Sequence, residues 1–70
     1  MNNFEKIIKQ GYFYNLFKDK CHILYRTDEF IVYKYYKYGY GWRYKAESME
    51  TFIIHTDSGR LHSAERKARK

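Results

Sequence analysis

The first apolar pattern along the chain is a short stripe at helical spacing near the N-terminus. Phe4, Ile7 and Ile8 lie on one face of a helix. Asn3 can cap the start of this helix, and Gly11 can end it. Because three apolar residues do not hold a helix in water, we expect this helix to pack on the rest of the chain.

Short segments rich in aromatic and β-branched residues follow, and turn-forming residues separate them. The segments are 12–17, 21–26, 30–36, 42–46 and 49–56. Such segments favour strands joined by tight turns. For the first of them, a helix that continues through Gly11 to residue 17 is an alternative. The pattern predicts an α+β fold, in which the short N-terminal helix packs on a four- to five-stranded antiparallel sheet, a meander of hairpins.

The hairpin of residues 30–36 and 42–46 has two faces, and their content depends on its register. If Tyr36 lies opposite Gly41, one face is apolar and the other is basic. A slip of one residue would place Tyr35 opposite Arg43 and mix the two faces. The sequence therefore predicts the segregated register, with these residues in the core: Ile31, Tyr33, Tyr35, Trp42, Tyr44 and Ala46.

The charge of the chain is strongly asymmetric. The net charge is +6, and residues 30–46 contain four basic residues and no acidic one. Residues 47–59 contain only acidic charges, whereas residues 60–70 are again basic. This distribution indicates a polyanionic partner.

We therefore predict a small non-enzymatic protein that binds nucleic acid or a nucleoprotein through the basic, tyrosine-rich face of this hairpin. Lysine and arginine neutralise phosphates, and exposed tyrosines offer surfaces on which bases stack. The C-terminal basic cluster adds phosphate contacts. The predicted binding residues are Lys34, Tyr36, Lys37, Tyr38, Tyr40, Arg43, Lys45, Arg66, Lys67, Arg69 and Lys70.

The alternative is a phage or mobile-element inhibitor or adaptor that binds a host or defence protein, as anti-CRISPR proteins do. Tyrosine and arginine dominate the energetics of many protein interfaces, and an acidic protein surface would then be the partner. The abundance of Tyr, Lys, Ile and Asn is typical of an AT-rich genome, such as that of a low-GC bacterium or its phage. In either case we expect a monomer or a small homo-oligomer.

No catalytic, metal or cofactor site is expected. The candidate soft ligands are Cys21, His22, His55 and His62, and they do not have the spacing of a zinc site. Cys21 and His22 are neighbours in a predicted strand and should point to opposite faces, so they do not form a nucleophile and its base. A glycine-rich phosphate loop is also absent from the sequence.

The chain of 70 residues is long enough for one domain. We expect residues 1–62 to form a small globular domain and residues 63–70 to form a basic tail. Two alternatives stay open for the segment that starts at residue 60: a short strand, or a helix that begins near Ser58. The single cysteine fits a reducing bacterial or phage-infected cytoplasm. No apolar run is long enough to span a membrane.

Overall fold

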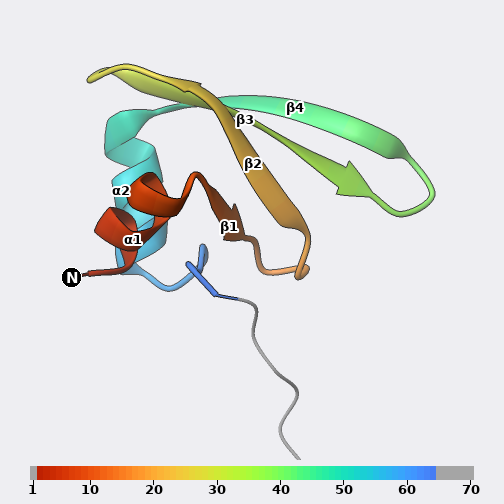
Figure 1. The fold of residues 1–70 in the computed structure, drawn as a ribbon, viewed down its shortest axis with the longest axis horizontal. Helices are drawn as coiled ribbons and strands as arrows, with labels where there is room; N and C mark the ends of the chain where they lie inside the picture. Colours follow the sequence, from red (N-terminus) through yellow and green to blue (C-terminus); the bar gives the residue numbers. More distant parts are fainter. Residues whose placement is uncertain (1, 65–70) are drawn as a thin grey trace, which may run out of the picture.

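The computed structural model describes residues 2–64, which form two helices and one antiparallel sheet (Figure 1). The elements are α1 (Asn3–Gln10), β1 (Tyr12–Tyr14), β2 (Lys20–Arg26), β3 (Phe30–Lys37), β4 (Gly41–Ser48) and α2 (Met49–Asp57). The four strands pair in chain order, so the predicted α+β fold with a meander of hairpins is confirmed. Neither of the two helices is long and apolar enough to cross a membrane.

Local hydrogen bonds define both ends of α1. The Asn2 side chain accepts from the Glu5 N–H at 2.8 Å, and the Glu5 carboxylate accepts from the Asn2 N–H at 3.3 Å. The cap is therefore Asn2, and the prediction of Asn3 was one residue late. Gly11, with φ +84°, ends the helix and donates its N–H to Ile7. The chain then enters β1, which excludes a helix that continues to residue 17.

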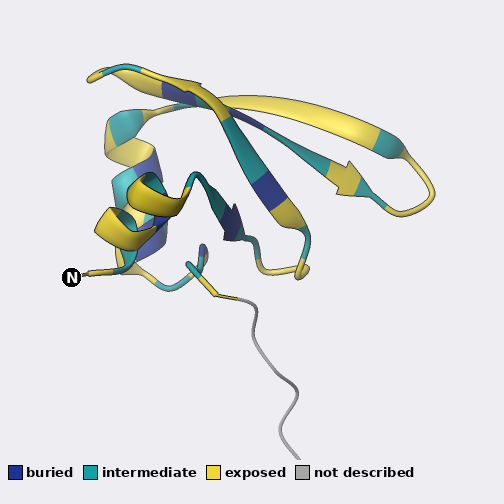
Figure 2. Cartoon of the chain, in the orientation of Figure 1, coloured by how far each residue is buried: buried dark blue, intermediate teal, exposed yellow. Residues whose placement is uncertain are grey.

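The core lies between the two helices and one side of the sheet. The ring of Phe13 meets those of Tyr33 and Phe52 edge-on, at centroid distances of 4.9 and 5.2 Å. The buried positions gather where the helices meet β1, β2 and β3 (Figure 2). The buried apolar residues are Ile7, Phe13, Cys21, Ile31, Tyr33, Phe52 and Leu61.

Residues 49–56 form most of helix α2, so the prediction of a strand there was wrong. Ser48 caps the helix, because its side chain accepts from the Thr51 N–H at 3.1 Å. Phe52 and Thr56, four residues apart, are both buried. Docking of this helical face on the sheet overrides the β-branched composition that favoured a strand.

The predicted register of the β3–β4 hairpin was wrong by one residue. Tyr36 lies opposite Trp42, and Tyr35 lies opposite Arg43. The turn between the strands contains Gly39 with φ +86°, and the Tyr40 N–H donates to the Lys37 carbonyl at 2.9 Å. These turn bonds fix the pairing that the apolar pattern argued against.

The segment after α2 returns to the first strand. His62 pairs with Tyr14 as an isolated antiparallel bridge, with N–H to carbonyl distances of 2.8 and 2.9 Å. Of the two alternatives for this segment, the short extended pairing is the closer description, since residues 60–64 form no helix. The last six residues of the predicted tail, 65–70, lie outside the described part of the chain.

Candidate functional site

The side of the sheet that faces away from both helices carries aromatic and basic side chains on all four strands. Residues that pair directly across an antiparallel ladder share a side of the sheet, so the strand pairing assigns this surface. None of its residues belongs to the core cluster. We call this surface the open face, and its strand residues are Tyr12, Tyr14, Lys20, His22, Tyr25, Phe30, Val32, Lys34, Tyr36, Trp42, Tyr44, Ala46 and Ser48.

Trp42 occupies the centre of a cluster on the β3–β4 half of the open face. Its ring meets that of Tyr36 edge-on, with centroids 5.5 Å apart, and the His22 ring lies at 6.4 Å. The Lys34 ammonium is 4.7 Å from the Trp42 ring centroid, within cation–π range. These contacts join one residue of β2, two of β3 and one of β4 into a single surface.

A second group lies on the β1–β2 half of the same face. The Lys20 ammonium is 4.3 Å from the ring centroid of Tyr12. The rings of Tyr12 and Tyr14 are 6.2 Å apart and nearly perpendicular. Because Tyr12 pairs with His22 and His22 pairs with Lys34, this group continues directly into the Trp42 cluster.

The open face is both accessible and free of negative charge. Trp42 and Tyr36 are 51% and 52% exposed, and Tyr44 is 68% exposed. No Asp or Glu lies among the strand residues of this face. Contiguous exposed patches of aromatic residues are uncommon on small monomeric proteins, which makes this face the first candidate for a binding surface.

The structure separates the strand residues that the sequence grouped into one binding surface. Lys34 and Tyr36 lie on the open face. Arg43 and Lys45 pair with the core-side residues Tyr35 and Tyr33, and Lys37 follows Tyr35 by two residues on β3. All three therefore lie on the opposite side of the sheet. The shift of one residue in register therefore divides the predicted basic face, because it moves every side chain of β4 to the other side relative to β3.

The remaining predicted residues lie at the hairpin turn or beyond the described chain. Tyr38 and Tyr40 are 92% and 68% exposed in the turn that projects away from both helices (Figure 1). The Arg43 guanidinium is 5.7 Å from the Tyr40 ring centroid. The four basic residues of the C-terminal cluster lie outside residues 2–64; they are Arg66, Lys67, Arg69 and Lys70.

Sequence reasoning missed most of the open face. Trp42 and Tyr44 were expected in the core, because large aromatic residues usually supply buried area. Residues of β1 and β2 were not considered as part of the surface. A signal did exist in the alternation of Lys20 and His22 with the apolar neighbour Cys21, which places the two polar residues on one side of a strand.

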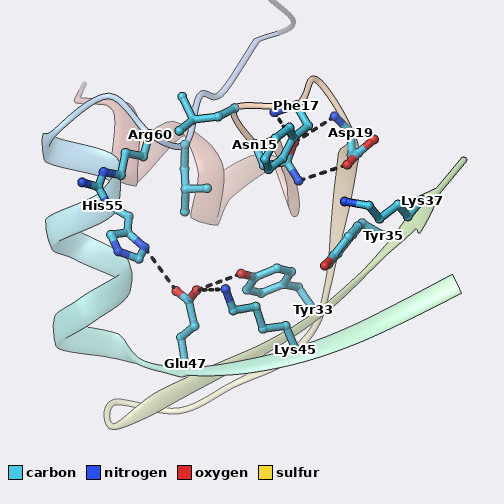
Figure 3. Close-up of a pocket in the computed structure, with 12 residues that line it drawn as sticks. Asn15, Phe17, Asp19, Tyr33, Tyr35, Lys37, Lys45, Glu47, His55 and Arg60 are labelled. Atoms are coloured by element: carbon cyan, nitrogen blue, oxygen red, sulfur yellow. Dashed lines mark hydrogen bonds and ion pairs between the residues drawn. The ribbon is translucent and has the colours of Figure 1, made fainter. Parts of the chain in front are cut away.

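The helix side of the sheet contains a polar pocket, drawn in Figure 3. Glu47 on β4 is at its base, with 7% of its side chain exposed. One carboxylate oxygen, Oε1, accepts the Tyr33 hydroxyl at 2.9 Å and lies 3.2 Å from the Lys45 ammonium. The other oxygen, Oε2, is 3.7 Å from Nδ1 of His55 on α2.

Burial and the neighbouring Glu47 carboxylate raise the pKa of Tyr33 well above its usual value of 10.0. The phenol of Tyr33 is therefore a hydrogen-bond donor across the physiological pH range. Its hydrogen bond to Glu47 links β3 to β4. This bond persists until the phenol loses its proton, which requires strongly alkaline conditions.

The cysteine and histidines do not meet as a catalytic or metal-binding group. Cys21 points into the core and His22 lies on the open face, as expected for neighbours in a strand. Burial raises the pKa of the Cys21 thiol from 9.0 to about 12, which leaves it unreactive near neutral pH. Among residues 2–64, no three His, Cys, Asp or Glu side chains are grouped in a way that could hold a metal ion.

Comparisons with protein-family models, curated proteins and solved structures gave no match to this chain. The function must therefore be argued from the residues and geometry of the open face and of the pocket.

Proposed function

We propose that this protein binds single-stranded nucleic acid across the open face of its sheet. The observation that carries the proposal is the continuous exposed surface on which Trp42, Tyr36 and Tyr44 lie beside Lys34 and His22, with no acidic residue on the same strand positions. Exposed aromatic side chains on a four-stranded antiparallel sheet are a known platform for unstacked bases.

Stacking supplies the first part of the binding energy. Each base that stacks on an aromatic side chain contributes about 1–3 kcal/mol. The half-exposed rings of Trp42 and Tyr36 lie in one cluster, so two neighbouring bases have adjacent partners. Because every base has a flat face, this mode gives little sequence preference.

Electrostatic attraction supplies the second part. Lys34 and Lys20 both extend over aromatic rings of the open face, which places their ammonium groups beside the expected path of the bases. The net charge of +6 favours a polyanion over the whole molecule. The affinity should fall as salt rises. Each phosphate contact with such a cation adds about −0.7 to the slope of log K against log salt for a single strand.

The geometry favours single strands over duplexes. In a duplex the bases stack on one another, and their flat faces cannot reach the rings of Trp42 or Tyr44. A single strand can turn its bases onto the sheet while its phosphates contact Lys34.

The experiment uses Trp42 as its own reporter, since it is the single tryptophan of the chain. Stacking of a base on its ring should quench its fluorescence. Titration with unlabelled 15-nucleotide dT, dA and U strands should give saturable quenching, with a Kd of about 1–100 µM near physiological salt. The matching duplex should quench much less.

Variants separate the open face from general charge attraction. Fluorescence anisotropy of a labelled strand should show at least about tenfold weaker binding for Trp42→Ala and for Tyr36→Ala. Ile54→Ala and Lys9→Gln are matched controls, because both residues are exposed and lie on helices, off the open face and outside the pocket of Figure 3. Their affinities should stay within about twofold of the parent.

The salt dependence tests the role of the lysines. Lys34→Gln should reduce the slope of log Kd against log salt by about 0.7, whereas Lys9→Gln should leave it unchanged. Equal binding of duplex and single strands, or full affinity in Trp42→Ala, would contradict the proposal. The absence of Trp42 quenching with every strand would also contradict it. That result would favour the alternative, in which the open face binds a protein, as in an inhibitor or adaptor.

A further inference from the structure

The pocket of Figure 3 lies on the opposite side of the sheet from the open face. Its volume is about 180 Å³. Most ligand pockets measure about 300–1,000 Å³, so this one has room for a single ring system, and the rest of a ligand would stay at its mouth.

The base of the pocket contains a buried hydrogen-bond acceptor that is not satisfied. Glu47 Oε2 is buried and accepts no hydrogen bond within the described chain. Its neighbour His55 Nδ1, at 3.7 Å, is too distant for one. Buried carboxylate oxygens are normally hydrogen-bonded, and leaving one without a donor costs free energy. An N–H or O–H group that enters the pocket would find this acceptor.

The charge around Glu47 indicates a neutral donor. Its other oxygen, Oε1, already lies beside the Lys45 ammonium and accepts the Tyr33 hydroxyl. A cationic group near Oε2 would meet the Lys45 charge at close range, and His55 and Arg60 line the same pocket. Amino or imino N–H groups of a planar heterocycle are neutral donors of this kind.

Lysine and arginine outnumber the carboxylates in the lining of the pocket, which favours an anion at its mouth. Lys37 from β3 and Arg60 from the segment after α2 line opposite sides of it (Figure 3), and neither forms an ion pair within residues 2–64. The Asp19 carboxylate also lines the pocket. The Lys37 ammonium lies over the Phe17 ring, 5.0 Å from its centroid, and Figure 3 shows its side chain pointing into the pocket. Tyr35 supplies an aromatic wall between this rim and Glu47.

We propose that this pocket binds a nucleoside monophosphate. A base N–H donates to Glu47 Oε2, the base lies against Tyr35, and the phosphate contacts Lys37 at the mouth. The donor, the planar ring and the anion are each matched by a different group of the pocket. This site does not depend on the open face, since the two surfaces share no residue.

The test is an NMR titration of the full-length chain with AMP, GMP, CMP and UMP in turn. At least one nucleotide should shift the amide signals of Glu47, His55 and Arg60 in a saturable manner below millimolar concentration. Adenosine and inorganic phosphate, which each carry only part of the recognised chemistry, should bind at least about tenfold more weakly than the best nucleotide.

Three variants assign the contacts. Glu47→Gln keeps one oxygen for Tyr33 and Lys45 but replaces the free acceptor by an N–H donor, so it should weaken nucleotide binding at least about tenfold. Lys37→Gln removes the cation at the rim and should weaken nucleotide binding while it leaves adenosine binding unchanged. Trp42→Ala should leave nucleotide binding unchanged while it weakens strand binding, which separates this site from the open face.

Three results would overturn the proposal. The first is the absence of saturable shifts at Glu47, His55 and Arg60 with all four nucleotides at millimolar concentration. The second is inorganic phosphate that binds as tightly as the best nucleotide. The third is unchanged affinity in both Glu47→Gln and Lys37→Gln.

Discussion

Two side chains on the core side of the sheet keep their protons through burial. Cys21 on β2 is fully buried, and Tyr33 on β3 is 4% exposed and donates to Glu47. Folding raises the pKa of both groups, because a buried anion is poorly solvated and is repelled by a nearby carboxylate. The thiol and the phenol therefore stay protonated in the folded state. The protein should therefore be more sensitive to alkaline than to mildly acidic conditions at these two positions.

The contribution of these two groups to the free energy of unfolding should be constant up to about pH 9 and should fall above that pH. The pKa of Cys21 rises from 9.0 to about 12 on folding, and that of Tyr33 rises above 10.0. Each raised pKa means that the unfolded chain releases its proton first, so stability is lost as pH increases. Urea unfolding at intervals from pH 7 to 11 measures this dependence.

Two variants identify the groups responsible. Tyr33→Phe should flatten the part of the curve above pH 10, and Cys21→Ala should flatten the part that begins near pH 9. A free energy of unfolding that stays level up to pH 11 in the parent chain would show that neither proton is held by the fold.

At the scale of elements, the fold depends on the transition from strand β4 to helix α2 at Ser48. The Ser48 side chain accepts from the Thr51 N–H at the first turn, and the Met49 N–H donates to the Glu29 carbonyl at 2.8 Å. These two bonds turn the chain back across the sheet. Phe52 then closes the core against Phe13.

Ser48→Ala should therefore destabilise the protein by about 0.5–2 kcal/mol, the usual cost of losing a helix N-cap. Ser48→Asp keeps an acceptor for the Thr51 N–H and should retain most of the stability. Urea denaturation followed by circular dichroism measures both. Equal stability of the alanine and parent chains would show that packing of Phe52 alone determines where α2 begins.

The sequence predicted the elements with a strong local signal. The N-terminal helix has a polar cap and Gly11 at its end, and the first four predicted strands are bounded by turn residues. The first of them was predicted too long, since β1 ends at Tyr14 and not at residue 17. Residues 49–56 were misassigned because their β-branched residues favour a strand, while Phe52 and Thr56 are buried on one helical face. That preference depends on contact with the sheet, which local sequence does not contain.

The candidate site was only partly predictable for the same reason. The tyrosine-rich hairpin was correctly located, but the side on which Trp42 and Tyr44 lie depends on a shift of one residue at a glycine-containing turn. The sequence also could not indicate that Phe13 and Phe52 fill the core, which leaves Trp42 at the surface. The Glu47 pocket is built from β3, β4, α2 and the segments before β2 and after α2, and it has no local motif.

At the scale of the whole molecule, a single side chain near the N-terminus joins the beginning of the described chain to its end. The Asn3 amide donates to the carbonyls of Thr56 and Leu61 at 3.2 and 2.6 Å. Its oxygen accepts from the Ser63 N–H at 2.9 Å. All three bonds span more than fifty residues of sequence, so they hold α1 against the segment that follows α2.

Asn3→Ala should lower the free energy of unfolding by about 1–3 kcal/mol, because it leaves partly buried backbone groups without their partners. Lys6→Ala, at an exposed position on the same helix, is the control and should change it by less than about 0.5 kcal/mol. Chemical denaturation measures both. A cost for Asn3→Ala no larger than that for Lys6→Ala would show that the three bonds add nothing to stability.

The proximity of Asn3 and Ser63 also means that the order of the elements along the chain can be changed without changing their arrangement. A short peptide could join these two positions, and new ends could be opened in the exposed turn at residues 38–40. In such a circular permutant, β4 would be the first strand and β3 the last, instead of forming a local hairpin. Its folding rate, compared with that of the parent, would measure how much this hairpin accelerates assembly of the sheet.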